Sequence, residues 1–474
     1  MPYPTERASR LGHVPTVNSA AVKAAFQRWT VAQAKPQDKT SVTSLCVPVE
    51  ALPEVNGGAD VTMAITVDGS DSEVEATREY PTIKVGYIRV AGSLLDINKL
   101  KSSRSNGTIN PIELRRSYES YAFDAALPGS GLVLPGNSGR GTWRVEIDRF
   151  LRESTIDNRS IDNPEIPDLT LADALLIMHG RPASPAKDAP VRVCPSCATK
   201  FIAGTEPRVT RDGGSCPKCK ADLYLGDVLR THDEYVEEGS NQTSMTRAMV
   251  MAERLMTLGY MDSFVSEYDD AEEILRRTIF ITDGPLALFG AVAPLKRRLT
   301  EYNAALYEWG VQKGLTLPLL VGIEKSGRFV EHADLIKDLI PVNHVMHLTT
   351  KYINKITGRP ENHAYGVDEF YGRRFIYRTS SGDPLVITVP PKSGILPYRG
   401  DGSEDLSSYP TLRVICEVLD KVRTRLYPNA LIPVALAHNA ASLPLGVGHS
   451  VLRAMAQKGI GLPKNSQIRY RSPF

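Results

Sequence analysis

Two aspartates stand where acidic side chains could hold a divalent cation. Asp68 follows the apolar, β-branched run 61–67 (VTMAITV), and Asp283 follows the run 278–282 (TIFIT). Each run is short and bounded by an Asp-Gly pair, which predicts a buried strand that ends at the acid. Ligands in open α/β sheets gather at the carboxyl ends of strands, so the repeated pattern favours a metal site. One Asp-Gly pair alone usually marks an ordinary turn.

Four of the six cysteines form two C-P-x-C motifs separated by 18 residues. They are Cys194, Cys197, Cys216 and Cys219. This spacing matches a four-thiolate zinc site, in which each tight turn directs two sulfurs at one tetrahedral ion. The alternative is two disulfides, which are unusual in a chain that has no secretory signal. Four thiolates leave no open coordination position, so we expect a structural zinc, and we expect Cys46 and Cys416 to be ordinary buried thiols.

The bulk composition narrows the class of protein. Lys and Arg total 56 against 54 for Asp and Glu in 474 residues, so a protein that coats nucleic acid through overall charge is not indicated, although a local basic groove is possible. The apolar share of 42% is that of a globular chain. No apolar run approaches the roughly 20 residues of a membrane helix, and the first residues lack a secretory signal. We therefore expect a cytoplasmic protein without a membrane segment.

The order of the predicted elements favours an α/β domain that carries hairpins. Predicted strands end at Asp68 and Asp283 or span 80–91, 317–323, 374–379, 385–389 and 431–437. Predicted helices span 20–33, 168–179, 244–258, 293–310, 332–339 and 409–426. The segment 101–140 is rich in Ser, Gly, Asn and Arg, which predicts long loops with a short helix. Asp401-Gly402-Ser403 repeats the Asp-Gly-Ser string without an apolar run before it, which predicts a turn.

Several short phrases, taken in order along the chain, resemble those of the NurA nucleases. They are TVDGS (66–70), ITDGPLA (281–287), VGIEKSG (321–327) and ALAHNAA (435–441). Two more, EGSNQ (238–242) and YGRRF (371–375), resemble a bacterial branch that carries a zinc ribbon. Each phrase is only moderately specific, and their shared order, from about residue 60 to about residue 455, carries the resemblance.

The resemblance implies an α/β, RNase H-like core with a mixed sheet and flanking helices, interrupted by an inserted zinc ribbon. It also implies a homodimer that cleaves DNA with Mn²⁺ or Mg²⁺ and works with a HerA-type hexameric ATPase, in DNA end processing or antiphage defence. The corresponding segments are an N-terminal helical extension (1–58), two parts of the core (59–185 and 224–474) and the ribbon between them (190–223).

Phosphodiester hydrolysis in such a core needs oxygen ligands around Mn²⁺ or Mg²⁺. Asp68 and Asp283 are the first two candidates. The resemblance adds Glu253 as a third ligand, although a helix glutamate considered from sequence alone is more often solvated. Acidic residues that remain as alternatives are Glu267, Glu272 and Glu273.

His438 and Lys325 complete the predicted site. His438 ends the predicted strand 431–437, and the resemblance makes it a fourth metal ligand or a proton shuttle, whereas a lone histidine there is more often structural. Lys325 follows the predicted strand 317–323 and either contacts the scissile phosphate as a point charge or is a surface lysine. Glu324 could be a ligand instead.

Three functions remain open at this stage. The first is a metal-dependent deoxyribonuclease, and the second is a non-catalytic adaptor of the same fold that recruits the ATPase to DNA. The third is a metal-dependent phosphoesterase that acts on a small substrate. A relic site has no reason to keep all four of Asp68, Glu253, Asp283 and His438, which favours the enzyme.

Two other kinds of segment bear on partners. The glycine-rich segments 129–131 and 136–141 do not match a phosphate loop, so ATP hydrolysis is expected of the partner. Basic clusters occur at Arg115-Arg116, Lys296-Arg297-Arg298 and Arg373-Arg374. Such clusters are usually solvated, but some could contact DNA phosphates without reading sequence.

Overall fold

The computed structural model describes most of the 474 residues. The described residues are 14–29, 39–55, 60–76, 82–102, 104–105, 108–109, 111–159, 165, 167–360, 364, 366–393, 405–424, 431–443 and 447–461. The turn predicted at Asp401-Gly402-Ser403 lies outside these residues. Among the described helices, none combines the length and the apolar character that crossing a bilayer requires.

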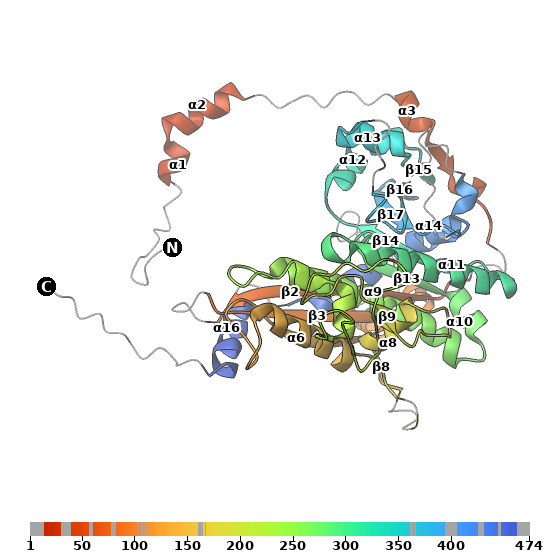
Figure 1. The fold of residues 1–474 in the computed structure, drawn as a ribbon. Helices are drawn as coiled ribbons and strands as arrows, with labels where there is room; N and C mark the ends of the chain where they lie inside the picture. The colour runs from red at the N-terminus through yellow and green to blue at the C-terminus, as the bar shows by residue number, and fades with distance from the viewer. Residues whose placement is uncertain are drawn as a thin grey trace.

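A nine-stranded mixed sheet organises the fold (Figure 1). Its strands, in spatial order, are β1 (Cys46–Pro48), β15 (His344–His347), β16 (Arg373–Arg378), β17 (Pro384–Val389), β14 (Leu320–Glu324), β13 (Thr278–Asp283), β2 (Met63–Glu75), β3 (Lys84–Asp96) and β6 (Tyr118–Pro128). β13 is parallel to both of its neighbours, β2 and β14, and every other pair in this sheet is antiparallel. The antiparallel run β2-β3-β6 is extended by the parallel strands β13 and β14, so the core is α/β with a mixed sheet.

Short two-stranded ribbons and helices complete the described chain. The ribbons pair β4 (Arg104–Ser105) with β5 (Thr108–Ile109), β7 (Thr155–Asp157) with β8 (Leu169–Thr170), β9 (Ala189–Pro190) with β10 (Arg208–Val209), and β11 (Gly214–Ser215) with β12 (Asp222–Leu223). The α-helices are α1 (Val14–Asn18), α2 (Ala20–Arg28), α3 (Lys39–Thr43), α4 (Ile97–Ser102), α5 (Pro111–Arg116), α6 (Gly139–Glu153), α8 (Leu171–Met178), α9 (Gln242–Glu267), α10 (Ala271–Arg277), α11 (Lys296–Gln312), α12 (Arg328–Ile336), α13 (Thr350–Thr357), α14 (Leu412–Lys421), α15 (Ile432–Ala441) and α16 (Val447–Gly459). The 3₁₀ turns are η1 (Val49–Ala51), η2 (Leu225–Leu229), η3 (Thr231–Asp233), η4 (Gly290–Leu295), η5 (Lys337–Leu339) and η6 (Leu406–Ser408).

Different helices cover the two faces of the sheet (Figure 1). Successive side chains of a strand point to opposite faces. Ile65 of β2 and Phe280 of β13 therefore join a first core with α6, α8, α9 and the ribbon cysteines, whereas Ala64 and Ile279 join a second core with α14 and α15.

One strand was missed in the segment predicted to be loops. β6 (Tyr118–Pro128) is an eleven-residue strand within 101–140, paired with β3 over its whole length. It lies at the sheet edge, and several of its side chains are exposed, so it lacks the continuous apolar run that marks the inner strands.

The last predicted strand, 431–437, is wrong: this segment is the helix α15 (Ile432–Ala441). A short apolar run is typical of a buried strand and of a buried helix alike. The sequence favours the helix at two points. Pro433 lies in the first turn, where proline is tolerated, and the alanines that follow have the highest helix propensity.

The N-terminal region contains more than helices. α1 and α2 have no buried residue, as expected of an extension. β1 (Cys46–Pro48), however, pairs with β15 at the edge of the main sheet. The range 1–58 therefore contributes a strand to the core as well as the predicted helical stretch.

Candidate active site

Asp68 and Asp283 lie side by side in the middle of the sheet. β13 and β2 are parallel, with Thr282 opposite Val67, so the two aspartates follow in adjacent strands. The sequence predicted that both strands end at their acids, and for Asp68 this is wrong. β2 continues to Glu75 because β3 pairs with it along its full length, so the Asp-Gly pair at 68–69 is extended strand and no turn. The acids meet where β13 ends beside a strand that continues.

His438 reaches the two aspartates from the helix α15, which packs on β2, β3 and β13. Asp283 lies two residues beyond Ile281 of the second core, so alternation points its side chain to the face that α15 covers. The Nδ1 atom of His438 lies 2.8 Å from Oδ2 of Asp68. One ligand atom from each of Asp68, Asp283 and His438 lies within 4.8 Å of the other two. The histidine was expected at the end of a third strand, and a helix supplies it instead.

Two residues that the sequence did not single out fix the end of α15. Ser70 and Arg89 are opposite one another on β2 and β3. The Ser70 hydroxyl donates to the carbonyl oxygen of Ala441 and accepts from the N–H of Leu443 at 3.0 Å. The Nε of Arg89 donates to the carbonyl oxygen of Ala440 at 2.8 Å. These bonds satisfy carbonyls that a helix end leaves without partners, and they hold His438 over the acids.

Glu253 approaches the acids from the other face of the sheet, on α9. Glu253 is buried, with 4% of the residue exposed. A Cβ added at Gly69 would lie 2.8 Å from Oε1 of Glu253, so only glycine at this position lets the carboxyl come so close to the strand. Burial, together with the charges of Asp68 and Asp283 and against that of Arg254, raises the pKa of Glu253 to about 8. Glu253 is not part of the three-residue cluster.

A buried arginine joins Glu253 to the loop that follows Asp283. Arg254 is 4% exposed, its Nη1 lies 3.4 Å from Oε2 of Glu253, and its Nη2 donates to the carbonyl oxygen of Pro285 at 3.2 Å. Tyr371 is buried near the same pair, and burial is the main reason that its pKa is raised. The N–H of Tyr371 donates to the carbonyl oxygen of Leu286 at 2.9 Å. The loop 284–287 is thus held from α9 and from the segment before β16.

Lys325 and Glu324 follow each other at the end of β14. The Nζ atom of Lys325 lies 2.6 Å from Oδ2 of Asp283. The Oε1 atom of Glu324 accepts from Nε of Arg374 at 2.6 Å, and the Arg374 guanidinium lies 3.8 Å from the ring centre of Phe329. Arg373 and Arg374 are buried, so this basic cluster is no solvated face. Arg374 engages the Glu324 carboxylate, whereas Lys325 turns toward the acid pair.

These residues surround an open hollow that a phosphate group could enter. The hollow has a volume of about 510 Å³ and is lined by Asp283, Gly284, Pro285, Glu324, Lys325, Ser326 and His438. Burial raises the pKa of Asp68, and the charge of Asp283 acts in the same direction, while His438 and Lys325 oppose them. A divalent cation would relieve the repulsion between the two carboxylates. Two carboxylates and an imidazole form a donor set that suits Mn²⁺, and the oxygens also suit Mg²⁺.

The alternative acids are occupied elsewhere. Glu267 pairs with Arg159, Glu272 pairs with Lys313 at 2.6 Å, and Glu273 pairs with Arg276 and Arg277. Among the described residues, none of these three belongs to the cluster around Asp68.

The four ribbon cysteines converge as the sequence predicted, with Cys194 and Cys216 buried. Their sulfurs are 3.7 Å apart between Cys194 and Cys219 and 3.9 Å apart between Cys197 and Cys216. Four sulfurs at about 2.3 Å from a tetrahedral zinc lie about 3.8 Å from each other, whereas a disulfide needs about 2.05 Å. The geometry therefore fits zinc ligation.

The two cysteine turns share one backbone geometry. Ala198 and Lys220, which directly follow the second cysteine of each motif, have φ of 53° and 62°. Each donates its N–H to the carbonyl oxygen of the first cysteine, at 2.9 Å in both turns.

A hydrogen bond from Thr199 is the main cause that lowers the pKa of Cys197 to about 6. A hydrogen bond from a backbone N–H is the main cause that lowers the pKa of Cys216. Burial raises the pKa of Cys194 to about 12, so the four thiols of the cluster do not share one protonation tendency without a bound ion.

The two other cysteines stand apart from these ligands. Cys416 is buried and Cys46 is half-buried, and burial raises the pKa of Cys46 to about 11. Neither residue belongs to a metal-binding group among the described residues.

Comparison with known proteins gives distant likenesses only. No protein-family model and no curated protein matches the chain. A crystal structure of the NurA nuclease from Sulfolobus solfataricus is 10% identical, with 87% of each chain covered and a TM-score of 0.32. A second crystal structure of NurA is 9% identical and covers 98% of this chain and 99% of that chain, with a TM-score of 0.26. Both matches are to NurA. At this distance the function has to be inferred from the geometry of the site.

Proposed function

We propose that this protein is a metal-dependent deoxyribonuclease that hydrolyses phosphodiester bonds with Mn²⁺ or Mg²⁺. The observation that supports this most is the convergence of Asp68, Asp283 and His438 at one edge of an open hollow. When bound there, the cation would polarise the phosphate and activate a water molecule, and these three side chains would hold it.

The residues around the cluster suit distinct tasks. Lys325, 38% exposed in its side chain, can leave Asp283 to neutralise a phosphate oxygen of the substrate. With its proton on Nδ1, His438 donates to Asp68, and its Nε2 is then free to bind the cation or to take a proton. Glu253 supports the acid pair from the α9 side as the third carboxylate, and Arg254 orients it.

An adaptor without catalysis is the second candidate, and one observation favours it. Each acid already has a partner within the chain, since Lys325 pairs with Asp283 and His438 with Asp68. A site whose acids are paired in this way could persist as structure alone. The two candidates differ in whether a divalent cation displaces these partners.

Cleavage assays separate the candidates. Linear and circular DNA are incubated with the protein and Mn²⁺, Mg²⁺ or EDTA, in parallel with Asp68→Asn/Asp283→Asn. The control Asp269→Asn/Asp334→Asn makes the same charge change at two exposed acids. We expect metal-dependent cleavage by the wild type and the control, and a loss of at least about 100-fold in the site variant.

The other outcomes point elsewhere. Full cleavage by Asp68→Asn/Asp283→Asn would show that the metal site is misassigned. Hydrolysis of a small chromogenic phosphodiester in preference to DNA would favour the phosphoesterase. If the wild type stays inactive even with a ring ATPase, the adaptor is the better description.

We further propose, from the sequence resemblance, that the protein acts as a homodimer in the cytoplasm together with a HerA-type hexameric ATPase on DNA ends. Light scattering of the purified protein, alone and mixed with such an ATPase, tests both associations. A monomer that does not co-elute with the ATPase would refute them without affecting the proposed chemistry.

A further inference from the structure

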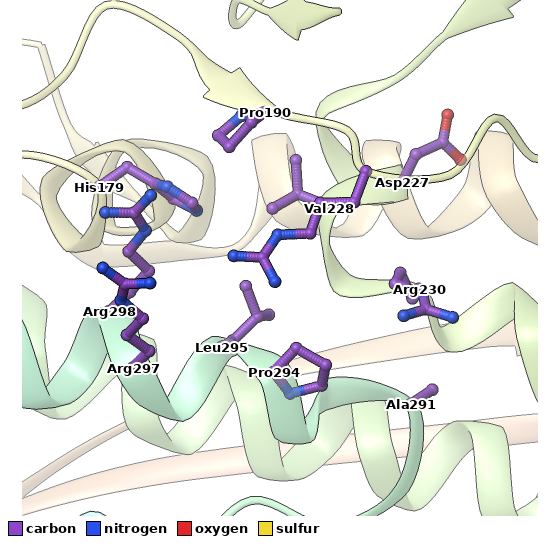
Figure 2. A pocket seen from close by; sticks show the side chains of 11 residues that line it. His179, Pro190, Asp227, Val228, Arg230, Ala291, Pro294, Leu295, Arg297 and Arg298 are labelled. Carbon is purple, nitrogen blue, oxygen red and sulfur yellow. The ribbon is translucent and has the colours of Figure 1, made fainter. Parts of the chain in front are cut away.

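A cationic pocket lies between the base of the zinc ribbon and the start of α11 (Figure 2). It is small, with a cavity volume of about 30 Å³, and none of its lining residues belongs to the candidate active site. Its polar lining residues are His179, Arg192, Asp227, Arg230, Arg297 and Arg298. Figure 2 shows Arg297 and Arg298 next to His179, while Arg230 lies on the opposite side with Leu295 and Pro294 between them. We call this the ribbon pocket.

Guanidinium groups from three separate segments give the ribbon pocket its charge. Arg192 follows β9 at the base of the ribbon, Arg230 follows η2, and Arg297 and Arg298 lie in the first turn of α11. Asp227 is already held by Arg144, with bonds of 2.7 and 2.8 Å to its two carboxylate oxygens. The pocket therefore presents cations without a free acid of its own.

The carboxylates that pair with these arginines are fewer than the arginines themselves, so the pocket keeps a net positive charge. Arg230 pairs with Asp233 at 2.7 Å, and Arg297 and Arg298 share the single carboxylate of Glu301, at 2.8 Å each. Arg192 forms no ion pair with any other residue that the structure describes. Four guanidinium groups thus share two carboxylates, which favours an anionic ligand.

His179 adds a polar atom that lacks a partner. Its Nε2 is buried and has no hydrogen-bond partner among the described residues. Burial, with the charges of Arg298, Arg208 and Arg192, lowers the pKa of His179 to about 3, so the ring is neutral at ordinary pH. Buried polar atoms are nearly always hydrogen-bonded, and an anion with several oxygens would supply the missing partner.

A second hollow along α11 adjoins the ribbon pocket and reaches Phe370, whose ring centre lies 4.7 Å from the guanidinium of Arg374, the partner of Glu324. Arg297 and Arg298 also line this second hollow, which has a volume of about 800 Å³ and includes Lys296. Phe370 packs edge-on against Phe289, which is 41% exposed, with ring centres 5.8 Å apart. The chain between Asp283 and Lys296 passes through Phe289. Cations that contact a backbone, next to an exposed aromatic ring, are the usual elements of a surface that binds a nucleic-acid strand.

We propose that the ribbon pocket binds a backbone phosphate of the DNA strand that enters the site at Asp68 and Asp283. The inference rests on the proposed nuclease function and adds a contact that the base of the zinc ribbon supplies through Arg192. Phosphate contacts of this kind fix the position of the strand and do not read its sequence.

Binding measured without catalysis tests this contact. Fluorescence anisotropy of labelled single-stranded and duplex DNA, in EDTA and at several salt concentrations, gives the slope of log Kobs against log salt concentration. We compare the wild type with Arg192→Ala/Arg298→Ala and with the control Arg149→Ala/Arg413→Ala, which removes two ion-paired arginines of α6 and α14. Loss of the single phosphate contact made by the pocket should lower the magnitude of the slope by about 0.7 for single strands and about 0.9 for duplex. The control should keep the wild-type slope.

Two further measurements protect the interpretation. Zinc content and Tm of each variant show whether the ribbon is intact, and Arg297→Ala, at a largely exposed side chain, replaces the double variant if that protein does not fold. Inorganic pyrophosphate is titrated as a free phosphate source. One contrary result is that pyrophosphate raises the Tm of the wild type while the variants bind DNA as the wild type does. That result would assign the pocket to free phosphate and overturn the inference.

The outcomes for the pocket and for the nuclease are separable. An unchanged slope in a variant that folds, with cleavage by the wild type intact, overturns only the pocket. A reduced slope in a protein that never cleaves DNA supports the pocket and removes the nuclease. A wild type that binds no DNA at low salt overturns the inference whatever the cleavage assay shows.

Discussion

The ammonium nitrogen of Lys325 lies 2.6 Å from Oδ2 of Asp283, so an acid that could bind a cation is already paired with one. On the other side of the cluster, His438 is bonded to Asp68 at 2.8 Å. The candidate metal site therefore already contains one cation, the ammonium group of Lys325, and a hydrogen-bond partner for Asp68. Any divalent ion has to compete with them, and this competition makes several properties of the site measurable.

Replacing Lys325 with methionine should tighten the binding of Mn²⁺ and weaken DNA cleavage. The change removes a positive charge next to a ligand oxygen, and since the lysine is partly exposed, we expect an increase in affinity of roughly 3- to 10-fold. Cleavage should fall because the phosphate loses its contact. Calorimetric titration with Mn²⁺ measures the first effect. Lys337→Met, at an exposed lysine of η5, should change neither quantity, and an unaltered Mn²⁺ affinity in Lys325→Met would refute the competition.

The sequence singled out side chains that converge in the structure, but it predicted the elements that carry them less well. Asp68, Asp283 and His438 converge, yet Asp68 lies within a long strand and His438 on a helix. An Asp-Gly pair is typical of turns, and only the neighbouring strand β3 shows that this one stays extended. The apolar run before His438 has no period that separates strand from helix. Side-chain chemistry was therefore readable where local backbone conformation depended on tertiary pairing.

Residues that position the site could not be found from the sequence, because their roles depend on pairs far apart in the chain. Ser70 and Arg89 hold the end of α15, and Arg254 joins Glu253 to the carbonyl oxygen of Pro285. The cysteine motifs were the opposite case. Their ligands lie close in sequence, so spacing alone predicted the cluster.

Ser70→Ala should weaken the metal site without altering the acids. The hydroxyl is the group on β2 that bonds both Ala441 and Leu443, so its loss frees the end of α15 and with it His438. Changes that loosen the orientation of a ligand typically cost 10- to 100-fold in metal affinity, and we expect about 10-fold here. Mn²⁺ titration measures it, with zinc content as a check on folding.

Ser442→Ala is the matched control for Ser70→Ala. Its hydroxyl bonds only locally, to the carbonyl oxygen of His438, in an exposed turn. Equal losses of Mn²⁺ affinity in the two variants would mean that the contact between Ser70 and α15 has no special role.

Glu253→Gln should remove a pH dependence from the stability of the metal-free protein. Burial raises the pKa of Glu253 to about 8, above the value of about 4.3 in an unfolded chain, so the folded state favours the protonated carboxyl. Its contribution to the free energy of unfolding is complete below about pH 4.3 and is lost as the pH rises through about 8. The loss amounts to at most about 1.4 kcal/mol for each pH unit in this window.

Urea denaturation in EDTA between pH 5 and pH 8 measures the difference between the wild type and Glu253→Gln. Glutamine imitates the protonated carboxyl, so the variant should be relatively more stable at pH 8 than at pH 5. Glu331→Gln, at an exposed position on α12, should follow the wild type. Parallel pH profiles for all three proteins would show that Glu253 titrates normally.

Cys216→Ser should release the zinc and destabilise the first core before it affects the chemistry of the acids. The ribbon is not an isolated appendage, since Cys194, Cys216, Val209 and Leu223 are buried in the core that also contains α8 and α9. Zinc measured by mass spectrometry should fall from about one ion per chain to almost none, with a clear decrease in Tm. Cys46→Ser is the control, because this half-buried thiol lies outside the cluster and should keep the zinc. If the folded variant retains Mn²⁺-dependent cleavage but shows a smaller slope of log Kobs against log salt concentration, the ribbon contributes to DNA binding and not to hydrolysis. Zinc retained in full by Cys216→Ser would contradict four-thiolate ligation.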